Sequence, residues 1–141
     1  GIVFYDKGSY SDGWRYLEAW TADEAGTYQY KKSETSTPGT STDVGSGYEN
    51  TYTAMAGSDH PAAEVVRNAT HGGYDDWFLP SKDELNQMYR QRGAIGGFDP
   101  SHYWSSSEPS ADYAWLQGFD DGNPDASPKN LDYRVRAARA F

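Results

Sequence analysis

The sequence predicts an α+β domain, with short antiparallel strands at both ends of the chain and two helices between them. Strand-like apolar and aromatic runs occur before residue 21 and again from Tyr103 onward. Helix signals occur only between these runs, near residues 61–70 and 81–93. Aromatic residues make up 16% of the chain and 15 glycines are present, which favours short strands and long loops over a helical bundle. A length of 141 residues predicts a single domain spanning 1–141.

The N-terminal part of the chain predicts two strands followed by a long loop. The run Ile2–Tyr5 is a compact strand candidate that Asp6, Lys7 and Gly8 should close, before a turn over residues 9–13. Residues 14–20 read as a second strand with bulky side chains on both faces. Residues 31–50 are rich in Ser, Thr, Gly and Pro, so we expect a loop there and the most mobile part of the chain.

The two predicted helices have different start signals. The first should run from Pro61 to Thr70 after a cap at Asp59 or His60, and it carries an apolar stripe at residues 62, 65, 66 and 69. The second should begin at Ser81, where Ser81 and Glu84 have the spacing of a capping box, and should end at Gly93. Its inner face should consist of Leu85, Met88 and Tyr89.

The C-terminal part predicts three further strands separated by a polar loop. The strand candidates are residues 103–106, 114–119 and 134–141. Residues 120–133 are polar and rich in Asp and Pro, so we expect a long loop there.

Charge and residue content exclude several classes of function. A net charge of −9 argues against nucleic acid and against an anionic membrane surface, and no apolar run is long enough for membrane insertion. The lack of cysteine excludes disulfides, thiolate metal sites and cysteine nucleophiles. No serine-nucleophile motif or zinc-type histidine spacing is present. We therefore expect a binding protein without enzymatic activity or cofactor.

Calcium is the one metal ion for which the sequence offers candidate ligands. Five aspartates lie close together in the C-terminal third, at positions 112, 120, 121, 125 and 132. Their spacing differs from that of an EF-hand, and acidic residues are common in turns. We therefore expect no bound metal.

Several blocks of the sequence resemble a bacterial domain family. The segment Gly72–Leu85 matches its GG.DW.LP...EL signature. Further matches are residues 3–6, 13–19, 104–108, 114–115 and 134–139, so the resemblance covers nearly the whole chain except the loop at 31–50. This family includes the C-terminal domain of the Legionella collagen-like protein.

The resemblance implies a C-type lectin-like fold of the formylglycine-generating-enzyme subtype. In that fold the terminal strands pair, and a long loop region presents the ligand-binding residues. Trp77, Trp104 and Trp115 would then pack in the core. The cysteine chemistry of the formylglycine-generating enzymes is excluded, because this chain has no cysteine.

The C-terminal third also resembles the variable region of proteins diversified by retroelements. In such proteins AAC codons become NNC codons, which cannot encode Lys, Glu, Gln, Met or Trp. Between residues 109 and 133 these types occur only at Trp115, Gln117 and Lys129, which we assign to the fixed frame along with Phe119 and Gly122.

This resemblance predicts a ligand-binding region within residues 101–133 that contacts a protein or glycan on a target cell surface. Tyr113 and Tyr133 are the expected anchors of this contact. The alternative is a fixed lectin-like adhesin domain that binds polysaccharide, for which an anionic polymer would require a basic patch of Arg134, Arg136 and Arg139. The candidate ligand-binding residues are Ser101, His102, Pro109, Ser110, Asp112, Tyr113, Leu116, Gly118, Asp120, Asp121, Asp125, Ser127, Leu131, Asp132 and Tyr133.

Overall fold

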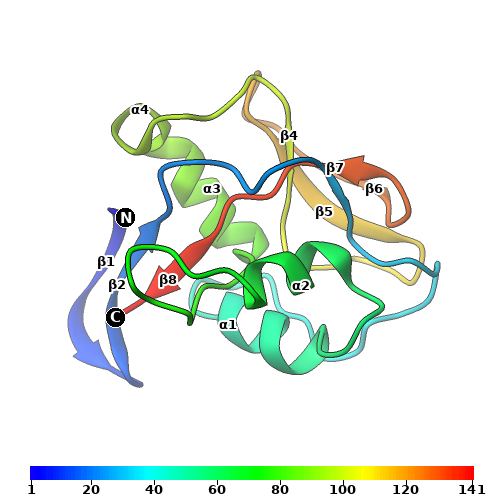
Figure 1. Cartoon of the computed structure of the whole chain (residues 1–141), viewed down its shortest axis with the longest axis horizontal. Helices are drawn as coiled ribbons and strands as arrows, with labels where there is room; N and C mark the ends of the chain where they lie inside the picture. The colour runs from blue at the N-terminus through cyan, green and yellow to red at the C-terminus, as the bar shows by residue number, and fades with distance from the viewer.

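The structure, a computed structural model, describes residues 1–141 and is an α+β fold with three small sheets (Figure 1). The strands are β1 (Ile2–Ser11), β2 (Trp14–Ala19), β3 (Tyr28–Gln29), β4 (His102–Trp104), β5 (Tyr113–Gly118), β6 (Pro124–Pro128), β7 (Asp132–Tyr133) and β8 (Ala138–Ala140). The helices are α1 (Gly47–Glu49), the π-helical turn η1 (Asn50–Ala54), α2 (Pro61–Arg67), α3 (Lys82–Arg90) and α4 (Arg92–Ile95). Figure 1 shows the sheet β1–β2–β8 at one end, the sheet β4–β5–β6 at the other, and α1, α2 and α3 between them.

The first sheet brings the two ends of the chain together. Strand β2 lies between β1 and β8, and Leu17 is opposite Ala140. This confirms the expected pairing of terminal strands. The predicted end of the first strand was wrong, because β1 continues to Ser11. The turn contains only Asp12 and Gly13, both with positive φ, as a tight Asp-Gly hairpin requires.

The two predicted helices are confirmed, and three short helical elements, α1, η1 and α4, were not predicted. At the start of α3, Ser81 Oγ accepts from the Glu84 amide and the Glu84 carboxylate accepts from the Ser81 amide, which is the expected capping box. Helix α3 ends at Arg90, short of Gly93, and α2 ends at Arg67, short of Thr70. None of the helices has the length and hydropathy needed to cross a lipid bilayer.

The unpredicted helical segment at residues 47–54 depends on contacts with distant parts of the chain. The Asn50 amide donates to Ser41 O at 2.8 Å and to Ser106 Oγ at 3.0 Å. The Thr51 hydroxyl accepts from the Leu79 amide at 3.0 Å. These residues have weak helix propensity and form no apolar stripe, so no local pattern indicates the segment.

The predicted polar loop at residues 120–133 contains two strands. Strand β6 pairs with β5, and β7 pairs with β3. Pro124 and Pro128 bound β6, a pattern that argues against a central strand. Strand β6 is the edge strand of its sheet. Proline has no backbone N–H to donate, but the open side of β6 faces no further strand, so no hydrogen bond is lost there.

Two clusters of buried side chains form the core. The first contains Trp77, Leu79 and Trp104, and the second contains Phe78, Leu85 and Tyr103. Residues 77–79 contribute to both clusters because alternate side chains of this extended segment point in opposite directions. The expected core positions of Trp77 and Trp104 are confirmed, whereas Trp115 is only partly buried and belongs to neither cluster.

A buried lysine fixes the C-terminal hairpin to the loop that precedes α1. Lys129 is fully buried, and its ammonium donates to Thr35 O at 2.9 Å and forms an ion pair with Glu108. Its backbone amide donates to Asp112 O, and its carbonyl accepts from the amides of Tyr30 and Lys31. The loop at 31–46 is therefore held at several points, and Thr37 is buried within it.

We expect Lys129→Met to lower the free energy of unfolding by about 3–5 kcal/mol, because Glu108 would keep a charge in a buried place without its partner. Lys32→Met is the matched control, since Lys32 is exposed and the change in net charge is the same. Urea unfolding followed by tryptophan fluorescence measures both.

The double variant Glu108→Gln/Lys129→Met tests how much of the lost stability is due to the unpaired charge of Glu108 and how much to the lost packing of the Lys129 side chain. We expect it to recover part of the stability lost in Lys129→Met, because no buried carboxylate remains unpaired. A double variant less stable than Lys129→Met alone would contradict the role given to the ion pair.

The stability of the fold should also depend on pH through His60. This side chain is 5% exposed, its Nε2 lies 2.9 Å from Thr37 Oγ1, and its Nδ1 has no hydrogen-bond partner. Burial, and secondarily the nearby Lys31 ammonium, lower the pKa of His60 from 6.5 to about 4. The unfolded chain therefore takes up a proton before the folded one does as the pH falls.

As the pH falls from about 7 to about 5, protonation of His60 in the unfolded chain should lower the free energy of unfolding by about 2 kcal/mol. In His60→Gln this contribution should vanish, whereas His102→Gln, a change at an exposed histidine, should retain it. Urea unfolding at the two pH values checks this. Equal pH dependence in His60→Gln and the unsubstituted protein would exclude His60 as the source.

Candidate ligand-contact surface

The fifteen predicted ligand-binding residues lie on the sheet β4–β5–β6, its connecting segments and the adjoining β7. Ten of them are exposed, Ser101 and Tyr133 are partly exposed, and Leu116, Gly118 and Ser127 are buried. In Figure 1 this region occupies the end of the molecule away from the N- and C-termini. The exposed residues are His102, Pro109, Ser110, Asp112, Tyr113, Asp120, Asp121, Asp125, Leu131 and Asp132.

The hairpin β5–β6 divides these residues into groups. A tip group surrounds the start of β5, where Tyr113 is opposite Pro128 and the amide of Lys129 reaches Asp112 O. A turn group lies at the far end of β5, where the amide of Phe119 donates to Ser101 O. The six residues of β5 separate the two groups. The tip group comprises Pro109, Ser110, Asp112, Tyr113 and Leu131, and the turn group comprises Ser101, Asp120 and Asp121.

A middle group lies on one face of the sheet between the tip and the turn. His102 is opposite Gly118, and Asp125 is opposite Leu116, so these positions share a face. Tyr133, in β7 beside Asp132, lies over this face: its hydroxyl is 2.9 Å from Ser127 Oγ and its ring is 5.8 Å from that of His102. Burial leaves Leu116 and Ser127 too little surface to contact a partner directly, so the middle group is His102, Asp125, Asp132 and Tyr133.

The two predicted aromatic anchors differ in their surroundings. Tyr113 is 45% exposed, and the structure gives its hydroxyl no hydrogen bond. The ring of Tyr133 lies 4.9 Å from that of Trp104 in an edge-to-face arrangement. Tyr113 is therefore free to contact a partner, whereas Tyr133 also stabilises the fold.

The positions predicted as fixed frame attach the hairpin to α3. Gln117 is 2% exposed, and its amide donates to Asn86 Oδ1 at 3.0 Å and to Gly122 O at 2.9 Å. A Cβ atom on Gly122 would lie 2.5 Å from the ring of Tyr89, and the residue has a φ of +80°. Trp115 packs under the Lys82 ammonium, which is 4.1 Å from its ring centroid.

The sequence did not predict that α3 holds the β5–β6 hairpin in place. Asn86 and Tyr89 hold the hairpin through the contacts just described, whereas the sequence predicted for this helix a capping box and a core-facing side and no contact with the C-terminal region. A polar Asn next to the apolar positions Leu85 and Met88 was the available signal.

The acidic residues of this region close turns. The Asp120 carboxylate accepts from the Asp121 amide, and the Asp121 carboxylate accepts from the Asn123 amide. The pKa of Asp121 is lowered, chiefly by the hydrogen bond from the Asn123 backbone amide to its carboxylate. The structure contains no group of three His, Asp or Glu side chains arranged to hold a metal ion.

The three arginines near the C-terminus do not form a basic patch. Arg136 is fully buried against Asp23, and Arg134 pairs with Asp23 and Asp99. Arg139 pairs with Glu18 and Asp76. The positive charge that an anionic polysaccharide would need is thus neutralised within the domain.

The candidate surface is an exposed face and not a cavity. Three pockets are present in the structure, and none of them is lined by any of the fifteen predicted residues. Such a surface suits contact with an extended partner better than enclosure of a small molecule.

Comparison with known proteins identifies the family. No curated protein matches the chain significantly. The sequence profile of the Lcl C-terminal domain matches residues 19–139, which is most of the chain and includes the region 101–133. This family has a C-type lectin-like fold, in agreement with the α+β architecture, and the match indicates a lectin-like binding module. The chain therefore belongs to the family of the C-terminal domain of the Legionella collagen-like protein.

Proposed function

We propose that this domain is a receptor-binding module whose surface within residues 101–133 is diversified by a retroelement. Its targets are proteins or glycans on a cell surface, and it acts by binding alone, without catalysis or a cofactor. Its place of action is a virion surface, or the outside of a cell. Within the C-type lectin-like fold we assign it to the formylglycine-generating-enzyme subtype.

One observation carries this proposal. The positions whose residue types lie outside the NNC code are those that attach the hairpin to the rest of the domain. Gln117 and Lys129 are buried and hydrogen-bonded, and Trp115 packs against Lys82. The code can reach all of the other 22 positions within residues 109–133, and 13 of these have exposed side chains. Substitution at such exposed positions costs little stability, so the surface can change while the frame stays the same.

Binding would rely on surface complementarity. Tyr113 offers a large, rigid aromatic surface at a small entropic cost, and short polar side chains such as Ser110 and Asp112 surround it. The hairpin β5–β6, fixed to α3 and to the loop at 31–37, holds these side chains in place before a partner arrives.

Sequencing the 3′ end of this gene across its source population tests the diversification. We expect variation to be concentrated at the exposed positions, in codons whose template counterparts carry adenine, with a near-identical template repeat nearby. Codons for Trp115, Gln117 and Lys129 should be invariant. If residues 101–133 are invariant and no template repeat lies nearby, diversification is excluded, and the fixed adhesin domain becomes the favoured interpretation.

A library of variants tests the scaffold independently. We expect NNC randomisation of Pro109, Ser110, Asp112, Tyr113 and Asp125 to change the free energy of unfolding by about 0.5 kcal/mol or less per position. Single substitutions Gln117→Ala and Gly122→Ala should cost more, about 1–3 kcal/mol, because they break buried hydrogen bonds or strain the backbone. Thermal unfolding of purified variants measures both sets, and equal losses in the two sets would contradict the division.

A further inference from the structure

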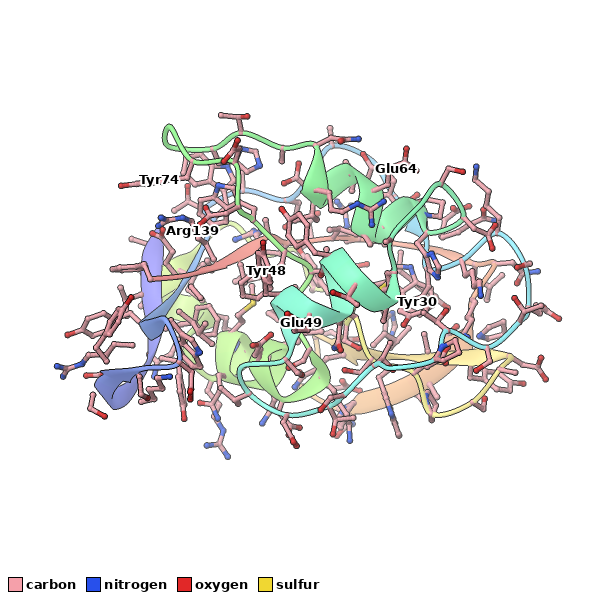
Figure 2. The ribbon with its side chains drawn as sticks, turned by 90° about the horizontal axis from the view of Figure 1, so that it is seen from below. Tyr30, Tyr48, Glu49, Glu64, Tyr74 and Arg139 are labelled. Carbon is pink, nitrogen blue, oxygen red and sulfur yellow. The ribbon has the colours of Figure 1, made fainter.

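A second site lies at the opposite end of the molecule, between the β1–β2 hairpin and α1. A cavity of about 350 Å³ is walled by three aromatic residues, Trp14 from β2, Tyr48 from α1 and Phe78. Figure 2 shows Tyr48 and Glu49 on α1 near the middle of the view, with Arg139 and the blue hairpin to their left. No residue of 101–133 lines this cavity, so it is independent of the proposed contact surface.

The residues that line the cavity carry only negative charge. Four of them are carboxylates, and none is Lys, Arg or His. Two of the four are compensated, because Asp76 pairs with Arg139 and the Glu84 carboxylate accepts from the amides of Gly45, Gly47 and Ser81. The other two, Asp12 and Glu49, are exposed and form no ion pair. Their uncompensated charge favours a cationic ligand.

The hydrogen bonding in the cavity selects among cations. Both oxygens of the fully buried Glu84 are already occupied by backbone amides, so this carboxylate has little capacity left for a ligand's N–H groups. A primary ammonium carries three donors. Asp12 and Glu49 at the rim can accept from donors that face outward, but a donor directed toward the aromatic walls costs free energy because it has no acceptor there. A fully methylated ammonium has no donor to satisfy, and its charge is stabilised by the faces of aromatic rings.

The protein's own Lys7 provides an independent indication that this place accepts an ammonium. Its Nζ lies 3.9 Å from the ring centroid of Trp14. Lys7 lines a groove that adjoins the cavity and shares Asp12, Trp14, Gly45 and Glu49 with it. An ammonium group is therefore already stabilised beside one of the aromatic walls.

We propose that this cavity is a binding site for a methylated ammonium group of the choline type. Trp14 and Tyr48 contact the methyl groups, the buried Phe78 closes the base of the cavity, and Glu49 and Asp12 attract the charge from the rim. Gly45 keeps one wall open, since a Cβ atom there would lie 3.1 Å from the Trp14 ring.

Three ligands of similar size test the chemistry in calorimetric titrations of the purified domain. Choline carries a trimethylammonium, ethanolamine carries a primary ammonium, and 3,3-dimethyl-1-butanol has the shape of choline without its charge. We expect choline to bind with a dissociation constant on the order of 1 mM and the other two at least about tenfold more weakly. Equal binding of the neutral alcohol, equal binding of ethanolamine, or no binding of choline would each overturn the proposal.

Matched variants test the location. Glu49→Gln keeps the shape of the side chain and should weaken choline binding about fivefold through loss of charge. Glu34→Gln changes the net charge equally at an exposed glutamate outside the cavity and should leave the affinity unchanged. Trp14→Leu should weaken binding about tenfold by removing an aromatic wall. Equal effects of Glu49→Gln and Glu34→Gln would place the binding elsewhere, whatever the outcome for residues 101–133.

Discussion

The buried Lys129 joins the C-terminal hairpin to two parts of the chain that are distant in sequence. Its ammonium contacts Thr35 and Glu108, and its backbone contacts Tyr30 and Asp112. A charge removed from water is stable only with a partner and further hydrogen bonds, and Lys129 has both. Because Glu108 and Lys129 stand at the two ends of the segment 109–128, their contact fixes both ends of this segment to the domain.

This arrangement explains how an irregular region can be rigid without being apolar. The hairpin β5–β6 is held by Lys129 at one end and by the contacts of Gln117 and Gly122 with α3 at the other. Its exposed side chains take no part in these contacts, so they can determine which partner is bound without determining whether the domain folds. The anchors are polar, which also explains why a chain with 36% hydrophobic residues maintains a fixed structure.

The distribution of charge separates the two candidate sites. The arginines near the C-terminus are used inside the domain, in pairs with Asp23, Glu18 and Asp76. The excess of acidic residues is therefore left on the surface, around the cavity beside α1 and along the tip and turn of the β5–β6 hairpin. Anionic ligands are disfavoured at both places, and an organic cation suits the cavity, where aromatic rings are added to the charge.

The sequence by itself determined those features that residues near one another specify. The capping box of Ser81 and Glu84, the strand β2 and the family blocks around Trp77 are local patterns, and each was predicted. Only the tertiary structure decided the helical turn at 47–54, the edge strand β6 and the extension of β1. It also decided which predicted contact residues are exposed and which aromatic residues meet in the cavity. Trp14, Tyr48 and Phe78 come from separate segments, and no spacing along the chain connects them, because their proximity depends on long-range pairing and buried hydrogen bonds.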